Sequence, residues 1–127
     1  MSDKIPVPLD LTTLAFKSID VLSLAKELLR SEQAVRDGRA ARTLAKSKGL
    51  TAVLTVVPAG GNVGEHTAPG PVVIIPLVGT ATFSSGAGRE EPHPISVGQA
   101  LFVGEGQKHQ VAAREDCAFL IIIGLQS

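Results

Sequence analysis

The chain contains no tyrosine and no tryptophan, and its aromatic side chains are four phenylalanines among 127 residues. No phenolic hydroxyl is therefore present to act as an acid or a base. Without Tyr or Trp, the chain also has no good platform for stacking a sugar ring or a nucleobase. The composition thus argues against functions that depend on such stacking.

An excess of charge of one sign is missing as well, because 12 Lys and Arg residues balance 12 Asp and Glu residues. Such a chain has no excess of positive charge to attract nucleic acid or an anionic membrane. Its single cysteine, Cys117, precedes an apolar run and is expected to be a buried packing residue. The opening residues lack the apolar core of a secretory signal, and no apolar run reaches the ~18 residues of a membrane span. We expect a cytoplasmic protein without a membrane or nucleic-acid partner.

Apolar side chains, by contrast, are abundant and make up 44% of the residues. A chain of this length forms one domain, so the apolar surplus must fill its interior or be covered in an oligomer. Zero net charge also does little to keep copies of the chain apart. These features predict a homodimer.

The apolar period of residues 23–36 is helical. Its predicted buried face comprises Val21, Leu24, Ala25, Leu28 and Val35. Asp20 or Ser23 is suited to begin this helix, and Gly38 is suited to end it. Five cations follow between residues 36 and 48, and this pattern is typical of a solvated face.

From residue 50 onward the period is that of β-strands, separated by Gly and Pro clusters. The predicted strands are 50–57, 63–67, 72–78, 80–84, 95–97, 100–103, 110–114 and 118–124. So many short strands favour a closed or two-sheet antiparallel structure. Pro76 lacks an amide hydrogen and requires a free edge or a bulge. The predicted organisation is an N-terminal arm and helix over residues 1–45 and a β-barrel domain over residues 46–127.

Two histidines stand in frames punctuated by glycine. The frames read Gly60-x5-His66-x-Ala68-x3-Val72-x6-Gly79 and Gly98-x5-Gly104-x-Gly106-x2-His109. Both resemble the paired motifs of the cupin superfamily, G-x5-H-x-H-x3,4-E-x6-G and G-x5-P-x-G-x2-H-x3-N. The resemblance covers roughly residues 50–125 and is strongest to small, single-domain, RmlC-like bacterial cupins. It implies an all-β fold, the cupin double-stranded β-helix or jelly-roll barrel, here with an N-terminal α-helical segment.

The resemblance also implies a site at the barrel mouth, where the family holds a transition metal with three His and one Glu. Only His66 and His109 match those positions, because Ala68 and Val72 replace the other two ligands. Glu65 neighbours His66 but is expected to point outward, since successive strand residues face opposite sides. Two readings stay open. The histidines either bind a divalent metal (Zn, Ni, Fe, Mn or Cu) completed by water, or face each other without a metal.

Function divides in the same way. The first hypothesis is a binding module that holds a small, largely apolar metabolite, with His66 and His109 as polar anchors and Val72, Ile74 and Phe102 lining the pocket. The alternative is a metal-dependent enzyme of the oxygenase, decarboxylase or isomerase type with a reduced two-His site. The missing donors at positions 68 and 72 favour the first hypothesis, and the sequence assigns no catalytic residue.

Overall fold

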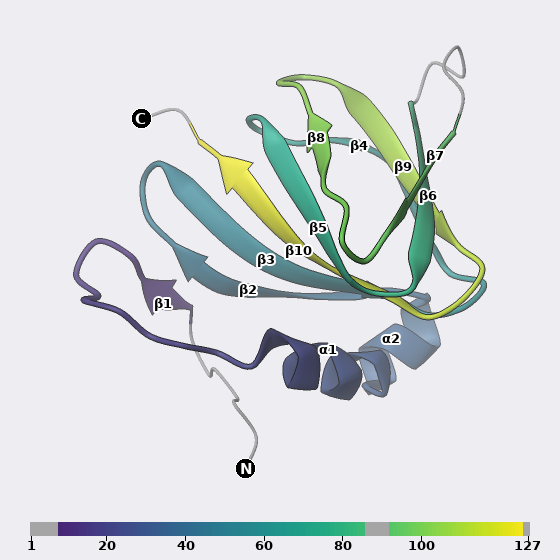
Figure 1. Ribbon diagram of the computed structural model, residues 1–127, viewed down its shortest axis with the longest axis horizontal. Coiled ribbons are helices and arrows are strands. Elements are labelled where there is room, and N and C mark those ends of the chain that lie inside the picture. The colour runs from purple at the N-terminus through teal and green to yellow at the C-terminus, as the bar shows by residue number, and fades with distance from the viewer. Residues whose placement is uncertain (1–7, 86–91, 126–127) are drawn as a thin grey trace.

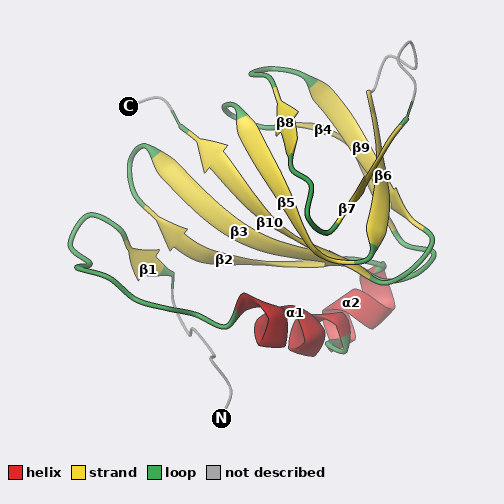
Figure 2. Ribbon diagram, viewed as in Figure 1, coloured by secondary structure: helices red, strands yellow, loops and turns green. Residues whose placement is uncertain are grey.

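The structure, a computed structural model, describes residues 8–85 and 92–125. Their strands form two sheets that face each other, and two short helices lie beneath the larger sheet (Figure 1). Strands dominate the chain and helices are confined to its N-terminal part (Figure 2). The predicted all-β barrel with an N-terminal helical segment is confirmed.

The larger sheet has the strand order β1-β2-β3-β10-β5-β8. Its strands are Leu9–Asp10 (β1), Ala40–Lys46 (β2), Leu50–Val57 (β3), Cys117–Gly124 (β10), Val72–Val78 (β5) and Leu101–Val103 (β8). All pairs are antiparallel except β1 with β2. Strand β10, the last in the chain, lies between β3 and β5, and this central position explains its nearly unbroken apolar sequence.

The smaller sheet has the strand order β4-β9-β6-β7. Its strands are Asn62–Thr67 (β4), Lys108–Ala113 (β9), Thr80–Ser85 (β6) and His93–Ser96 (β7). Every strand predicted from residue 50 onward is present, with ends that differ by a few residues. Apolar and β-branched runs bounded by Gly and Pro turn clusters were sufficient to locate them, because each strand contributes side chains to the space between the sheets.

Side chains from both sheets pack together in part of the space between them. The buried members of this core are Val57, Val72, Ile74, Ala81, Phe83, Ile95, Val111, Ala113, Cys117 and Phe119. Phe83 of the smaller sheet meets Phe119 of the larger sheet edge to face, with ring centroids 5.5 Å apart and an interplanar angle of 64°. Such aromatic pairs add about 0.5–1.5 kcal/mol beyond the area they bury.

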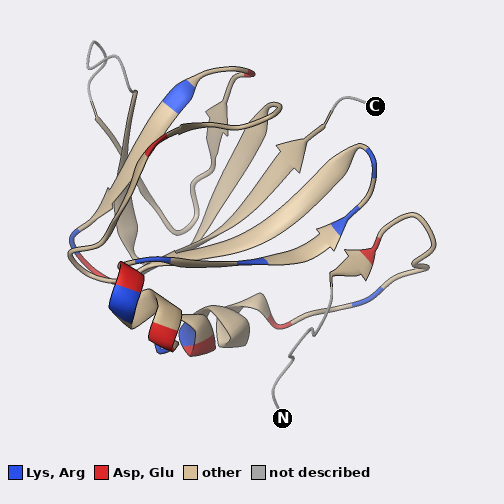
Figure 3. Cartoon of the chain, turned by 180° about the vertical axis from the view of Figure 1, so that it is seen from behind, with Lys and Arg blue, Asp and Glu red and all other residues tan. Residues whose placement is uncertain are grey.

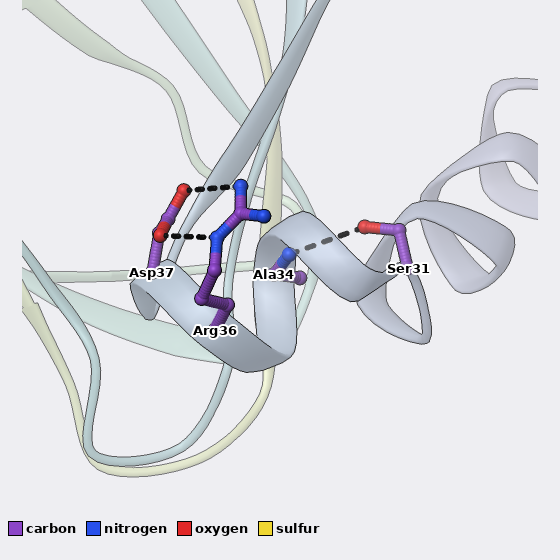
Figure 4. Close-up of polar contacts among 4 residues, drawn as sticks. All are labelled: Ser31, Ala34, Arg36 and Asp37. Carbon is purple, nitrogen blue, oxygen red and sulfur yellow. Dashed lines mark hydrogen bonds and ion pairs between the residues drawn. The ribbon is translucent and has the colours of Figure 1, made fainter.

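Two helices replace the single helix predicted over residues 23–36. They are Val21–Leu29 (α1) and Glu32–Asp37 (α2), and Ser31 separates them. The Ser31 hydroxyl donates to the Leu28 carbonyl oxygen (2.7 Å) and accepts from the Ala34 amide (3.2 Å; Figure 4). It therefore closes one helix and caps the next, because a local side-chain bond competes with helix continuation.

The predicted ends of this helical region are correct, while one predicted buried residue is not. Asp20 caps α1 by accepting from the Ser23 amide at 3.1 Å, and Gly38 ends α2 with a φ of 74°. Val35 is 76% exposed, because the break at Ser31 turns α2 so that Ala34 is buried instead. Neither α1 nor α2 is long and apolar enough to cross a membrane.

Helix α1 packs on the outer face of the larger sheet. It buries Leu24, Ala25 and Leu28 against Leu54 and Val56 of β3. Strand β3 is consequently covered on both faces, by the helix outside and by the barrel core inside. A strand covered on both sides is expected to be mainly apolar, and β3 is apolar at every position except Thr51 and Thr55.

The division predicted between residues 45 and 46 falls inside β2, which pairs with β3 from Ala40 onward. The sheet thus begins within the segment assigned to the N-terminal arm. The basic residues of this segment made the strand hard to recognise from the sequence. They lie at exposed positions of β2, while Leu44 and Ala45 are buried. All five cations between residues 36 and 48 are exposed, as predicted.

Pro76 lies at an irregular point of β5, as the lack of an amide hydrogen requires. It lies opposite Phe119, where the register between β5 and β10 shifts. On the other side of β5, the partner strand β8 pairs only as far as Ile74. The predicted irregularity at Pro76 is confirmed.

Candidate functional site

A cavity of about 370 Å³ lies between the two sheets. Most of its wall is apolar. The apolar lining residues are Ala40, Ala41, Val53, Val63, Ala68, Pro69, Val72, Ile74, Phe83, Val111, Phe119, Ile121 and Ile123. The polar ones are Gln33, Arg39, Thr55, His66, Thr67 and His109. An apolar cavity with a few convergent polar groups is the usual form of a small-molecule site.

His66 and His109 lie side by side on one wall of this cavity. His66 on β4 is the cross-strand partner of His109 on β9. Their ring centroids are 4.1 Å apart, with an interplanar angle of 65°. Pairing of the two strands thus brings together the two histidines that the sequence frames singled out.

A bulge in β4 turns His66 toward the cavity. The register between β4 and β9 shifts between Val63 and His66, and both of these residues line the cavity. In a regular strand, residues three apart face opposite sides. The bulge adds the extra residue that restores the inward direction, and Gly64 lies within it.

Both imidazoles are oriented by backbone carbonyl groups. Nδ1 of His66 lies 2.9 Å from the Gly64 carbonyl oxygen, and Nδ1 of His109 lies 3.3 Å from that of Gln107. Because a carbonyl oxygen only accepts, each Nδ1 carries the hydrogen of this bond. In the neutral form of an imidazole bonded in this way, Nε2 is the acceptor for a ligand donor group.

His109 is the more buried ring, with 7% of its surface exposed, whereas His66 is exposed. Burial lowers the pKa of His109 below its ordinary value of 6.5. The neighbouring His66 lowers this pKa further, against an opposing effect of the Gln107 carbonyl. Burial disfavours the charged imidazolium, so His109 is neutral at pH 7.

The donor set does not fit a resident transition metal. Among residues 8–85 and 92–125, no group of three His, Cys, Asp or Glu side chains could hold an ion. Ala68 and Val72 line the cavity without donor atoms. Glu65 is exposed and lies 3.7 Å from the Lys108 ammonium. Two imidazoles alone complete neither a tetrahedral zinc site nor a facial triad.

Phe102, expected from the sequence to line the pocket with His66 and His109, is not among the lining residues of this cavity and instead lines a neighbouring pocket that His109 also borders. The side chain of Phe102 is 74% exposed, and its cross-strand partner is Val73 on β5. Leu101 and Val103 on either side of it pack against the core, so strand alternation turns Phe102 outward. Val72 and Ile74 line the cavity, since they alternate with Val73 on β5.

Four polar residues of the cavity were not identified as site residues from the sequence: Gln33, Arg39, Thr55 and Thr67. Arg39 belongs to the basic stretch that was interpreted only as a solvated face. Gln33 lies on α2, outside the barrel strands altogether. The docking of α2 and the adjoining start of β2 brings Gln33 and Arg39 to the cavity, and the pairing of β3 and β4 within the two sheets brings Thr55 and Thr67 there. The local sequence pattern indicates neither arrangement.

Cys117 is a packing residue rather than a nucleophile. It is fully buried, and its thiol donates to the carbonyl oxygens of Thr80 (3.0 Å) and Glu115 (3.1 Å). Burial, together with the nearby Glu115 and Asp116 carboxylates, raises the pKa of Cys117 to about 11. The thiolate, which is the reactive form, is therefore scarce at neutral pH.

The architecture and the paired histidines define this chain as a protein with the cupin fold, and solved structures agree. A conserved protein of unknown function from Streptococcus pyogenes, SPY1581, superposes with a TM-score of 0.70 at 20% identity, covering 97% of this chain and 99% of that one. A cupin superfamily protein from Desulfitobacterium hafniense has a TM-score of 0.70 at 18% identity, covering 89% of this chain and 95% of its own.

An RmlC-like cupin with a double-stranded β-helix fold from Methanocaldococcus jannaschii has a TM-score of 0.63 at 18% identity, covering 70% of this chain and 82% of that chain. The predicted cupin resemblance is thus confirmed at the level of the fold. No protein-family model and no curated protein sequence matches the chain. Likeness at such low identity establishes the fold and leaves the activity to be argued from the site.

Proposed function

We propose that this protein binds a small, largely apolar metabolite in the cavity between its sheets, with His66 and His109 as polar anchors. The observation that carries the proposal is the cavity itself: about 370 Å³, walled by aliphatic and aromatic side chains, with both imidazoles on one side. At the ~30 Å³ that one water molecule occupies in the liquid, this space holds roughly twelve groups of that size. A ligand of seven to twelve non-hydrogen atoms, as a rough estimate, therefore fits.

The chemistry of the two rings supports a binding role. Each Nδ1 is engaged with a backbone carbonyl, so Nε2 is the atom that meets a ligand. His109 is neutral at pH 7 because its burial lowers its pKa. A neutral Nε2 accepts a hydrogen bond from a hydroxyl or amine group, while the apolar walls take up hydrocarbon.

The test is a titration with 1-hexanol followed by imidazole NMR of the uniformly ¹⁵N-labelled protein. The chain has three histidines, and His93 is exposed at the start of β7 and does not line the cavity. We expect the His66 and His109 resonances to shift with a dissociation constant on the order of 1 mM, the affinity suited to so small a ligand. His93 and His109 both line a neighbouring pocket, so an unmoved His93 resonance would show that hexanol occupies the cavity and not that pocket.

Two phenylalanine variants separate cavity binding from surface binding. Ala41→Phe fills the cavity from β2, whereas Ala112→Phe places the same ring on an exposed position of β9 outside it. We expect Ala41→Phe to abolish the shifts and Ala112→Phe to preserve them. The proposal fails if hexanol leaves both cavity histidines unchanged, or if Ala41→Phe binds it as well as the wild type.

A further inference from the structure

The cavity carries a positive charge at the place where the N-terminal segment meets the barrel. Of the described residues that line it, Arg39 has the one permanently charged side chain, and no Asp or Glu is among them. Arg39 stands between Gly38, the cap of α2, and Ala40, the first residue of β2. Gln33 of α2 and Thr55 of β3 add an amide and a hydroxyl to the same lining.

A close backbone contact holds Arg39 at this place. A Cβ atom added to Gly61 would overlap the Gly38 carbonyl oxygen, so the turn after α2 packs directly on the turn that leads into β4. That second turn is itself fixed, because the Gly61 carbonyl accepts from the Ala113 amide at 3.1 Å. Arg39 therefore follows a backbone segment that is anchored to both sheets.

The nearest acidic side chain in sequence is engaged elsewhere. Both carboxylate oxygens of Asp37 accept from Arg36, at 2.9 Å from Nε and 3.2 Å from Nη2 (Figure 4). This bond is the main reason why the pKa of Asp37 is lowered. Asp37 thus directs its hydrogen bonds to Arg36, while the charge of the nearby Arg39, a lining residue of the cavity, lowers the pKa of Asp37 to a smaller extent.

The surrounding surface makes Arg39 distinctive. Charged side chains gather on the helices, the turns and the strand ends, while most of the two sheets is free of them (Figure 3). A guanidinium at the rim of an apolar, weakly polarisable space interacts more strongly with an anion than one in bulk water does. Its planar fork of N–H donors matches the two oxygens of a carboxylate.

The two polar parts of the cavity lie apart along the barrel. Strand β4 starts beside Gly61, at the Arg39 end, and reaches His66 four residues after its first residue, Asn62. Val63 and His66 both line the cavity, and their partners on β9, Val111 and His109, are two residues apart, which at about 3.4 Å per residue corresponds to roughly 7 Å along the strands. A ligand that touches both ends must therefore have an elongated apolar body.

We propose that the ligand is a small aliphatic carboxylate, whose acid group pairs with Arg39 while its hydrocarbon body extends between the sheets toward His66 and His109. The inference rests on the proposed function and adds the chemical class of the ligand. Gln33 and Thr55 supply further hydrogen bonds at the acid end. The histidines then meet the far end of the ligand rather than its acid group.

The experiment compares three probes of the same chain length at pH 7.5 by calorimetry and by imidazole NMR: hexanoate, 1-hexanol and hexylammonium. We expect hexanoate to bind roughly tenfold more tightly than 1-hexanol, because a charge-assisted hydrogen bond at a partly exposed site contributes modestly. Hexylammonium should bind most weakly. The preference for hexanoate should shrink as salt is raised, since Arg39 is exposed.

Arg39→Gln removes the charge, and Arg42→Gln is the matched control. Arg42 is an exposed cation on β2, the strand that directly follows Arg39, and it does not line this cavity. Arg39→Gln should erase the preference for hexanoate while 1-hexanol binds as before, and Arg42→Gln should change neither. If 1-hexanol shifts the imidazole resonances of both variants as it does those of the wild type, the cavity is intact in both.

The outcomes separate this inference from the proposed function. If 1-hexanol binds and hexanoate binds no better, or if Arg39→Gln keeps the preference, the assignment of a carboxylate to Arg39 is overturned while cavity binding stands. If no probe shifts His66 or His109, both proposals are overturned. A preference that is lost equally in Arg42→Gln would point to overall surface charge and would also overturn the role of Arg39.

Discussion

Substitution of Gly79 by alanine should destabilise the protein much more than the same substitution at Gly106. Both glycines belong to the motif frames and have similar positive φ angles, 69° and 76°. An alanine in this left-handed region costs about 1–2 kcal/mol at either position. The two positions differ in what surrounds them, and this difference sets the prediction.

A Cβ atom at Gly79 would overlap the Asp116 carbonyl oxygen and lie 3.3 Å from the Cys117 sulfur. At Gly106 the same atom meets nothing within 4 Å. The turn between β5 and β6 packs on the turn before β10, and the Thr80 amide bonds the Glu115 carboxylate there at 2.8 Å. Relief of the overlap requires a backbone shift, for which overpacking costs of about 1–3 kcal/mol are typical.

We therefore expect Gly79→Ala to lower the free energy of unfolding by about 2–5 kcal/mol and Gly106→Ala by about 1–2 kcal/mol. Urea denaturation followed by circular dichroism measures both, and an unchanged m-value would show that the same two-state transition is compared. Equal losses within about 0.5 kcal/mol would refute the reasoning, because they would leave only the φ angle as the cause.

Two further predictions concern titratable groups of the core and the cavity. Cys117 should react with a disulfide reagent such as DTNB at pH 8 only after denaturation in urea, because burial raises its pKa to about 11. Rapid stoichiometric labelling of the folded protein would contradict this prediction. Because the pKa of His109 is lowered below 6.5 on folding, its stabilising effect is complete above pH 6.5 and is lost as the pH falls through its folded-state value. The melting temperature should consequently drop more steeply between pH 6.5 and 5 in the wild type than in His109→Gln. Parallel curves of melting temperature against pH for the two proteins would contradict a lowered pKa of His109.

Much of the barrel could be predicted from the sequence because its signals are local. Strand periodicity, the glycines of the two frames and the caps at Asp20 and Gly38 each reflect the conformation of a few neighbouring residues. The limits of this local information appear at Ser31. There, one hydroxyl divides a helical pattern in two, and the apolar period on either side of it does not reveal the break.

The candidate site was predictable only in part, since its residues come from distant segments. The frames identified His66 and His109, and the alternation of β5 placed Val72 and Ile74 on one face. The same alternation could not indicate that Phe102 points outward, because the register of β8 against β5 decides its direction. Register depends on pairing between strands and is not contained in either strand alone.

By itself, the sequence determined the class of fold, the histidine pair and the replacement of two ligand positions of the cupin motif by Ala68 and Val72, because these follow from residue identity and local spacing. Only the tertiary structure decided that a bulge turns His66 inward and that Gly38 packs on Gly61. That contact brings Arg39 from a basic surface stretch to the rim of the cavity. The physical reason is that a binding site is a property of side chains converging in space, and this convergence is set by sheet register and close packing between segments far apart in the chain.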